Sequence, residues 1–597
     1  MSFGERIKFR RGELKLSRGE LAGRLGVSPS AVSNYENGLS FPKEDVMLRL
    51  FDSLETDPNQ LFRDSFRGGG QALSSEEQTL LRKFRELSPL GRETVQSVTE
   101  ALWACRQETS PLPAERPEGR IIPLYHTLAA AGCVSAVPGE DFDEISVTEQ
   151  VPQTAEFAVR ISGDAMAPYL EDGAVVLDGG MVVEAGPLAQ MRAKYPQAEF
   201  VDARGGVIMP GLINVHTHIY SGLARGLAID GFRPTNFFEV LDGQWWNIDR
   251  HLTLDGTRAC AYATVLDCIR DGVTTIFDHH ASFGEIPGSL FAIKDVCHEV
   301  GIRANLCYEV SERDGAEKCA QAIRENAEFA RWARDEDDDM IRAMFGGHAL
   351  FTISDKTFEE MVRANDGMTG FHIHVAEGMN DVYDSLRNYG CRPVNRLLYN
   401  GILGEKTMLG HCIHISPAEM DILRETGTMV CHNPESNMGN AVGCSPVLQL
   451  YARGILLGLG TDAYTHDMLE SLKVLLPMQR HNACDPNVGW CEAMGMLFRN
   501  NPAICARYFQ KPLGVLEPGA AADVIVMDYK PFTPFSAENI DGHMLFGMMG
   551  KNCRTTIING KLVYRDREFV GIDEDRINAW CLEQSKKLWG RLNHRAY

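Results

Sequence analysis

Four apolar runs in this chain each end in side chains that bind metals or carry protons. The run GLINVHTH ends at His216 and His218, and residues two apart in a β-strand share a face, so both imidazoles can reach one metal ion. The three later runs end in the residues His374 with Glu377, His411, and Asp462. Polar residues at the carboxyl ends of successive strands are the layout of a catalytic (β/α)8 barrel. The sequence therefore predicts a barrel with a metal site at one end.

Strand-like runs alternate with helical stretches through much of the chain, which predicts a parallel sheet and an α/β fold class. We expect eight barrel strands, at residues 211–218, 274–280, 303–310, 341–348, 370–377, 407–414, 428–434 and 455–462. They define a barrel domain of residues 211–504. The tail returns to short strands, AADVIVMDY and TTIINGKLVY, so we expect residues 173–210 and 505–570 to form a small β-domain. Residues 571–597 are expected to form a C-terminal helix.

Residues 1–67 have the pattern of a small all-α domain. Ser17 is placed to cap a helix over residues 18–25. Ser28 is placed to cap a second helix, with Pro29 at its first position and an Asn-Gly stop at its end. The sequence therefore predicts two short helices joined by a tight turn.

The string LSRGELAGRLGVSPSAVSNYENG resembles the helix-turn-helix of phage-repressor-type regulators. The resemblance implies duplex DNA as a partner, contacted by Ser28, Ser30, Ser33 and Asn34. Acids and bases nearly balance in this segment, so non-specific DNA affinity is expected to be modest. The alternative is a small helical domain that makes protein contacts.

Residues 68–120 have the composition of a linker with one helix in it. Residues 121–172 contain AAAG and ISGDAMAPYLEDG, which resemble the self-cleavage site and nucleophile segment of LexA-type repressors. That family needs a serine nucleophile and an activating lysine. Here Ala165 holds the nucleophile position and Lys194 lies in a helical stretch. We expect a truncated LexA-like segment that does not cleave itself at Ala131–Gly132.

The string YLEDGAVVLDGGMVVEAG, followed by GGVIMPGLINVHTH, resembles the start of an amidohydrolase. The resemblance continues to the end of the chain, and CHNP followed by SN is similar to guanine deaminases, triazine hydrolases and SsnA-type aminohydrolases. It implies four metal ligands, namely His216, His218, His374 and Asp462. Three histidines and one carboxylate leave a coordination position for water. Metal binding lowers the pKa of that water from 15.7 to around 7, so hydroxide is available at neutral pH.

The ligand set indicates one divalent metal per chain. The end of the fourth strand carries glycines and His348 where two-metal amidohydrolases place a carboxylated lysine, so a mononuclear site is expected. Zn²⁺ is the first choice, and Fe²⁺ or Mn²⁺ also suit these ligands.

The resemblance also implies catalytic roles. Glu377 would carry a proton to a ring nitrogen and then to the departing amine, Asp462 would take the proton of the water, and His411 would hydrogen-bond the attacking oxygen. His348 and Asn433 are the expected substrate contacts. Four further histidines are expected to support the site or the core and not to bind the metal: His279, His280, His372 and His414.

Bulk composition limits the choice of partners and compartment. The formal net charge of −22 argues against a chain devoted to nucleic acid or anionic membranes, although a local patch can still bind DNA. Sixteen cysteines without C-x-x-C spacing favour reduced thiols, and the N-terminus has no apolar leader, so we expect a cytoplasmic protein with no membrane partner. We also expect a homo-oligomer.

Three functions compete at this stage. The first is a metal-dependent hydrolase of non-peptide carbon–nitrogen bonds that deaminates a small aminated heterocycle, such as a purine or pyrimidine. The second is a transcriptional regulator whose barrel senses a ligand. The third is a dehalogenase or ring amidohydrolase that uses the same hydroxide. A complete set of ligands and proton carriers favours the first, since a sensor has no need of both Glu377 and Asp462.

Overall fold

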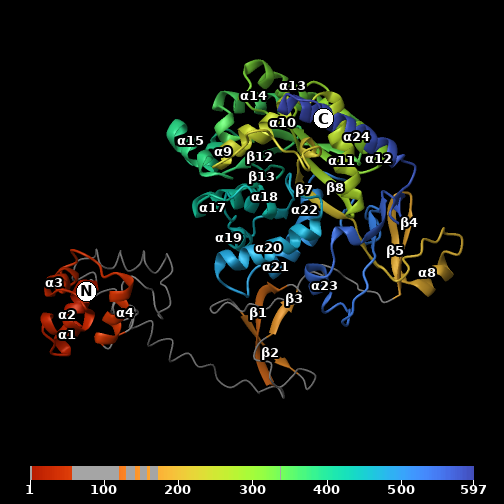
Figure 1. The fold of residues 1–597 in the computed structure, drawn as a ribbon. Helices are drawn as coiled ribbons and strands as arrows, with labels where there is room; N and C mark the ends of the chain where they lie inside the picture. The colour runs from red at the N-terminus through yellow and green to blue at the C-terminus, as the bar shows by residue number, and fades with distance from the viewer. Residues whose placement is uncertain are drawn as a thin grey trace, which may run out of the picture. The chain divides into compact units, whose positions relative to one another are not determined.

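The computed structural model describes residues 3–54 and 56, three strands between residues 120 and 161, and residues 172–336 and 338–597. It contains two compact units, Met1–Glu118 and Gly119–Tyr597 (Figure 1). The expected linker helix, the Ala131–Gly132 bond and Ala165 lie outside the described residues.

The N-terminal unit begins with four short helices, α1 (Phe3–Glu13), α2 (Arg18–Leu25), α3 (Pro29–Glu36) and α4 (Glu44–Ser53). Ser17 caps α2 in a capping box with Glu20, and Ser28 caps α3 by accepting from the Ala31 amide, as the sequence predicts. The helices enclose one apolar core: Ile7, Leu21, Ala22, Leu25, Val32, Tyr35, Val46, Leu50 and Leu54. Buried Glu36 pairs with Arg11 and Arg18 at 2.5 and 2.7 Å, which ties α3 to the helices before it.

Three strands precede the large α/β region. Strand β1 (Arg120–Ala129) pairs antiparallel with β2 (Phe142–Val147) and parallel with β3 (Ala158–Ile161). Lys194 is the last residue of helix α8 (Leu188–Lys194), as expected from its helical sequence context.

Each of the eight apolar runs contains a barrel strand, which confirms the predicted (β/α)8 architecture. The strands are β7 (Leu212–Thr217), β8 (Val273–His280), β9 (Arg303–Tyr308), β10 (Ile341–Ala343) with β11 (Phe345–Ala349), β12 (Phe371–Val375), β13 (Met408–His411), β14 (Met429–His432) and β15 (Leu457–Leu459). All pair in parallel, in the orders β10-β9-β8-β7 and β11-β12-β13-β14-β15. Single parallel bridges, Thr217 to Asp462 and Val310 to Gly347, join the two arcs into a closed ring.

Helices follow the strands and surround them (Figure 1). The longer ones are α11 (Leu254–Arg270), α12 (Ser289–Val300), α13 (Ala316–Glu336), α14 (Asp355–Asn365), α15 (Met379–Tyr389), α17 (Pro417–Thr426) and α20 (Met468–Ala483). Shorter helices are α9 (Phe237–Val240), α10 (Trp246–Arg250), α16 (Pro393–Tyr399), α18 (Pro434–Gly439), α19 (Val447–Ala452), α21 (Trp490–Gly495), α22 (Asn501–Cys505) and α23 (Ile540–Phe546). Among the helices of the described ranges, none is both long enough and apolar enough to cross a bilayer.

Strands from both sides of the barrel sequence build a small β-region beside it. The hairpin β4 (Gly173–Asp178) and β5 (Met181–Pro187) precedes the barrel, and a second sheet has the order β19-β18-β17-β16-β6. Its strands are β6 (Val207–Pro210), β16 (Val524–Met527), β17 (Cys553–Ile558), β18 (Lys561–Arg565) and β19 (Glu568–Phe569). Fully buried Arg303 of β9 reaches Asp523, just before β16, at 3.3 Å and ties this sheet to the barrel.

The final helix, α24 (Glu574–Asn593), contacts the segment that follows the H-x-H motif of β7. The Trp589 indole donates to the Leu223 carbonyl at 2.9 Å, and the Asn593 amide donates to the Ala228 carbonyl at 2.9 Å. The expected C-terminal helix thus fixes the chain beside the mouth of the barrel.

Candidate metal centre and active site

The predicted site residues come together because they end neighbouring parallel strands. His216 lies in β7, His374 in β12 and His411 at the end of β13. Asp462 follows β15, and its amide donates to the His216 carbonyl at 2.9 Å, where the barrel closes. The carboxyl ends of all these strands meet at one end of the barrel. The sequence pattern and the fold therefore agree on where a site can form.

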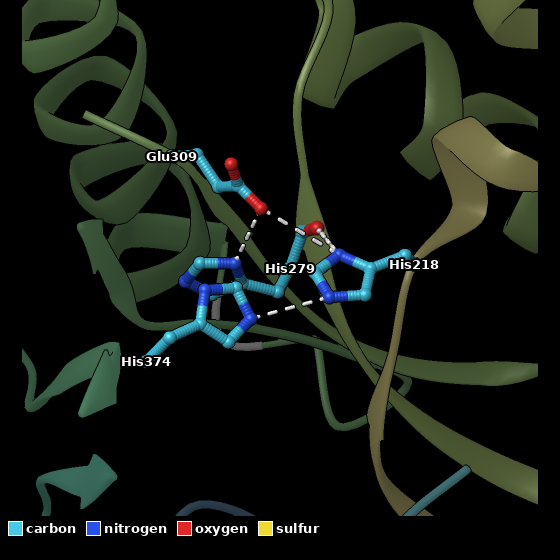
Figure 2. Close-up of side chains that lie close together, drawn as sticks. All are labelled: His218, His279, Glu309 and His374. Carbon is cyan, nitrogen blue, oxygen red and sulfur yellow. Dashed lines mark hydrogen bonds and ion pairs between the residues drawn. The ribbon is translucent and has the colours of Figure 1, made fainter. Parts of the chain in front are cut away.

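The hydrogen bonds of His218 and His374 define which ring nitrogens carry protons. Each donates from Nδ1 to a backbone carbonyl, His218 to His279 at 2.6 Å and His374 to His348 at 2.9 Å. Each Nε2 therefore presents a lone pair, and the two Nε2 atoms face each other at 3.2 Å (Figure 2). Two lone pairs at this distance repel unless a cation lies between them. Two histidines on one tetrahedral Zn²⁺ place their nitrogens about 3.3 Å apart.

His216 supplies a third nitrogen to the same place. Its Nδ1 lies 2.9 Å from His372 Nε2, while its own Nε2 is buried and has no hydrogen-bond partner among the described residues. Burial, helped by the neighbouring His218, lowers the pKa of His216 well below its ordinary value. Burial and the neighbouring His279 do the same to His374. Neutral imidazole is the form that binds a metal, so this environment suits a ligand.

Asp462 completes the set. Its Oδ1 lies 3.3 Å from His218 Nε2, and its Oδ2 lies 3.3 Å from His411 Nε2 and accepts from the Ser436 hydroxyl at 2.8 Å. Ligand atoms of His216, His218 and Asp462 all lie within 4.8 Å of one another. The donor set therefore fits one divalent cation.

His279 stands behind this centre as a support. Its Nε2 donates to the His372 carbonyl at 2.9 Å, and its Nδ1 faces the Glu309 carboxylate at 3.0 Å (Figure 2). Both ring nitrogens are already engaged in hydrogen bonds, so neither is free to bind a metal. A second possible metal group, made of His218, His279, Glu309 and His374, is therefore less suitable than the first. His414 donates to the Val442 carbonyl at 2.9 Å, away from the centre.

Glu377 lies on the loop after β12, beside the carboxylate of Asp462. Its Oε2 is 3.6 Å from His411 Nε2, and its Oε1 accepts from the Asn440 amide at 3.4 Å. Burial raises the pKa of Glu377 to about 7, while His411 opposes the shift and Asp462 adds to it. A carboxyl group with a pKa near neutrality can both take and give a proton at neutral pH.

The short helix α18 and the residue just after it hold all three proton-handling residues through side chains. Ser436 donates to Asp462, the Asn437 amide oxygen accepts from His411 Nδ1 at 2.8 Å, and Asn440 just past the helix donates to Glu377. The sequence shows Ser436 and Asn437 only as part of a family pattern, so their positioning role emerges from the fold. The helix fixes the orientation of the carboxylates relative to the metal ligands.

An open cavity of about 530 Å³ lies over the centre. Its lining includes His218, His374, Glu377, Asp462 and the expected substrate residue His348. His348 accepts from the Trp246 indole at 3.3 Å and donates to the Thr352 hydroxyl at 3.0 Å, and burial lowers its pKa to about 3.

Asn433, the other expected substrate contact, is not part of this lining. It is fully buried, and its Oδ1 lies 3.4 Å from the Cys431 thiol. It also lies beside Gly460, where an added Cβ would come 2.5 Å from the Asn433 oxygen. In this structure Asn433 therefore packs between strands behind the cavity.

Two acidic residues of the cavity are not predicted from the sequence. Glu309 directly follows β9, so the same strand-end signal that points to Asp462 could have found it. Asp381 lies in α15 and accepts from the backbone amides of Ala376 and Phe351 at 2.6 and 3.1 Å. It thereby braces the loop that carries Glu377.

Comparisons with known proteins identify the families that match the two parts of the chain. Residues 207–563 match the amidohydrolase family, residues 2–61 a helix-turn-helix domain, and residues 173–198 a bacterial imidazolonepropionase-like composite domain. The chain is 29% identical to a 5′-deoxyadenosine deaminase of Methanosarcina mazei, over 73% of this chain and 98% of that protein. It is 30% identical to a 5-methylthioadenosine/S-adenosylhomocysteine deaminase of Desulforudis audaxviator, over 70% of this chain and 95% of that protein. A zinc-bound adenosine deaminase structure from Xanthomonas campestris has a TM-score of 0.62 at 23% identity, over 71% of this chain and 95% of that chain.

Proposed function

The chain belongs to the amidohydrolase family, and on that premise we propose that it is a metal-dependent aminohydrolase that removes an exocyclic amine from an aromatic heterocycle. The main support for the proposal is a single arrangement of side chains. The Nε2 atoms of His218 and His374, each with a lone pair, lie 3.2 Å apart, close to Glu377, whose carboxyl pKa is about 7. The facing histidine nitrogens indicate a bound cation, and the pKa of Glu377 indicates a group that can carry protons at neutral pH. The curated relatives that the chain matches almost end to end are named as deaminases. The cysteine pattern favours action in the cytoplasm.

We assign His216, His218, His374 and Asp462 as the metal ligands. A divalent metal bound there supplies a water molecule whose pKa is lowered to around 7. Zn²⁺ suits three imidazoles and a carboxylate best, and Fe²⁺ or Mn²⁺ would also fit. His372 and the carbonyls of His279 and His348 orient the three rings from behind.

The proton-handling residues then divide the work. Asp462 would take a proton of the water, because it lines the cavity and its Oδ2 is held in place by the Ser436 hydroxyl. Both protons would come from the water: Glu377 would pass one of them to the ring nitrogen beside the attacked carbon, and would pass the one that Asp462 has taken to the departing amine, which leaves as ammonia. Asn437 fixes the His411 ring through Nδ1, so its Nε2 would be held in place to hydrogen-bond the oxygen that adds to the ring.

The direct test is ammonia release from a panel of aminopurines, aminopyrimidines and aminopterins, with metal content measured on the same sample. We expect ammonia from at least one compound, loss of activity when a chelator removes the metal, and recovery when Zn²⁺ is restored. Fully metallated protein that releases no ammonia from any member would contradict the proposal.

Replacement of Asn440 by alanine should disturb the proton carrier without emptying the metal centre. The Asn440 amide lowers the pKa of Glu377 by donating to its Oε1, so its loss should raise that pKa. The limb of the pH–rate profile that belongs to Glu377 should move to higher pH, and kcat should fall by about tenfold with little change in KM. Asn388→Ala, on the exposed face of α15, is the matched control. An unshifted profile in Asn440→Ala would remove Asn440 from this role.

We also propose that the N-terminal unit binds duplex DNA through α3. Ser28, Ser30 and Asn34 are exposed along it and Ser33 is half-buried, while Val32 and Tyr35 turn into the core. We expect weak binding, because the dimerisation segment inferred from the sequence is truncated and a second half-site adds much of the affinity.

The DNA prediction can be measured by fluorescence anisotropy with a labelled duplex. Affinity should fall on the order of tenfold or more between 50 and 200 mM salt. Ser30→Ala combined with Asn34→Ala should weaken binding further, while Ser40→Ala, exposed but outside α3, should not. Equal binding by all three proteins would place any DNA contact elsewhere.

A further inference from the structure

The cavity has an apolar and largely aromatic wall. It is formed by Tyr220, Phe237, Leu241, Trp245 and Phe351. The rings of Tyr220 and Trp245 meet edge to face, with centroids 6.4 Å apart. Such a wall suits a flat unsaturated ring, whose faces stack on aromatic side chains.

The charged groups that line the cavity all have the same sign. They are the carboxyl groups of Glu309, Glu377, Asp381 and Asp462. Within the described part of the chain, the lining includes neither lysine nor arginine. A metal in the centre adds positive charge only at the reactive wall, where the ring must react.

Two arginines over the Trp246 ring, Arg250 and Arg313, lie outside the cavity lining and are paired with carboxylates. Arg313 pairs with Asp249 at 2.5 Å and with Asp314 at 3.3 Å, and its guanidinium lies 4.0 Å from the ring centre of Phe283. Arg250 pairs with Asp314 at 2.8 Å. An anionic substituent in the cavity would therefore lose its hydration and gain no cationic partner.

Glu309 has one carboxylate oxygen that is available to accept a hydrogen bond from a bound molecule. Glu309 is 2% exposed, and its Oε1 accepts a hydrogen bond from His279 Nδ1 at 3.0 Å. Its second oxygen points away from the three histidines in Figure 2, and among the described residues no hydrogen bond reaches it. Because Glu309 lines the cavity, this oxygen can accept from an N–H or O–H group of a bound molecule.

We propose that the substrate is an aromatic amine without phosphate or carboxylate groups, and that Glu309 accepts a hydrogen bond from it. This inference rests on the proposed deaminase function and narrows its substrate class to neutral or cationic heterocycles. Glu309 is then a substrate-binding residue, distinct from the metal ligands and from the proton carriers.

The test uses three ligands that share one ring and differ in charge: 5′-deoxyadenosine, 5′-amino-5′-deoxyadenosine and adenosine 5′-monophosphate. Binding to the metal-loaded full-length protein is measured by calorimetry at pH 7, and ammonia release is followed in parallel. The cationic and neutral compounds should bind at least tenfold more tightly than the phosphate. Equal or tighter binding of the phosphate, or no binding by any of the three, would overturn the inference. The expected order of binding without ammonia release would leave it standing and count against the proposed function alone.

Glu309→Gln tests the residue itself. It should weaken binding of the cationic compound at least tenfold, leave the phosphate compound unchanged or tighter, and keep the metal. Glu312→Gln is the matched control, because Glu312 lies outside the cavity lining and accepts from Ser354 at 2.8 Å. Glu309→Asp keeps the charge and should keep the tighter binding of the cationic compound. It tests the assignment if the glutamine variant does not fold, because loss of that preference in Glu309→Asp would contradict a role for the charge. Unchanged cation binding in Glu309→Gln would refute the assignment.

Discussion

Replacement of Glu377 by glutamine should lower turnover about 10²–10⁴-fold while the protein keeps its metal. The loss corresponds to roughly 3–5 kcal/mol of activation barrier, the usual cost of removing a positioned acid or base. Glutamine retains the shape and can still accept from Asn440, but it cannot carry a proton. Because Glu377 is not among the proposed ligands, the effect should fall on kcat and not on metal content.

The experiment compares steady-state rates and metal content of Glu377→Gln with those of the wild type and of Glu312→Gln, which also removes one carboxylate from a loop at this end of the barrel. If Glu377→Gln turns over a confirmed substrate at the wild-type rate, then Glu377 is not the proton carrier. Such a result would favour a leaving group that departs without a proton, as a halide does in the dehalogenase alternative.

Replacement of His216 or His374 by alanine should empty the metal centre. Wild-type protein is expected to hold close to one divalent metal per chain, and either variant close to none, with turnover reduced to the background rate. The physical reason is that the remaining ligands number three, in a site where the fold fixes each ring from behind. Elemental analysis of dialysed protein provides the measurement.

Two further variants make this result specific. His414→Ala is the control, since His414 is half-buried and donates to Val442 away from the centre, and it should keep its metal. Asp462→Asn should bind metal more weakly and also lose activity. Full metal content in His216→Ala and His374→Ala would show that the ion sits in another group of side chains.

Much of the barrel could be predicted because its strands are buried on both faces and therefore appear as continuous apolar runs. Strands β7 and β12 lie within the predicted ranges 211–218 and 370–377. The fourth run is the exception, because it forms two strands with a break at Met344. There the chain changes partner, from β9 on one side to β12 on the other. A periodicity argument cannot detect such a change.

The centre was predictable to the extent that its residues end strands. His216, His218, His374, Glu377, His411 and Asp462 all stand in or just after an apolar run, and the fold brings them together. The supports were not predictable in the same way. Asn440 meets Glu377 across 63 residues of sequence, and the aromatic wall combines one helical segment, residues 237–245, with Tyr220 and Phe351 from distant parts of the chain. Contacts of this kind have no periodic signature in the sequence.

Four residues at this end of the barrel adopt left-handed backbone angles without being glycine: Ala376, His411, Cys412 and Asp462, with φ of 49, 66, 48 and 55°. Such conformations cost on the order of 1 kcal/mol each and persist where the surrounding structure enforces them. Selection for activity should therefore keep these residues, whereas selection for heat resistance should favour replacements that relieve the backbone strain. Glycine at Ala376 would relieve the strain yet loosen the loop that aims Glu377. A library screened only for thermal stability should therefore yield substitutions at these positions that raise the melting temperature and lower turnover.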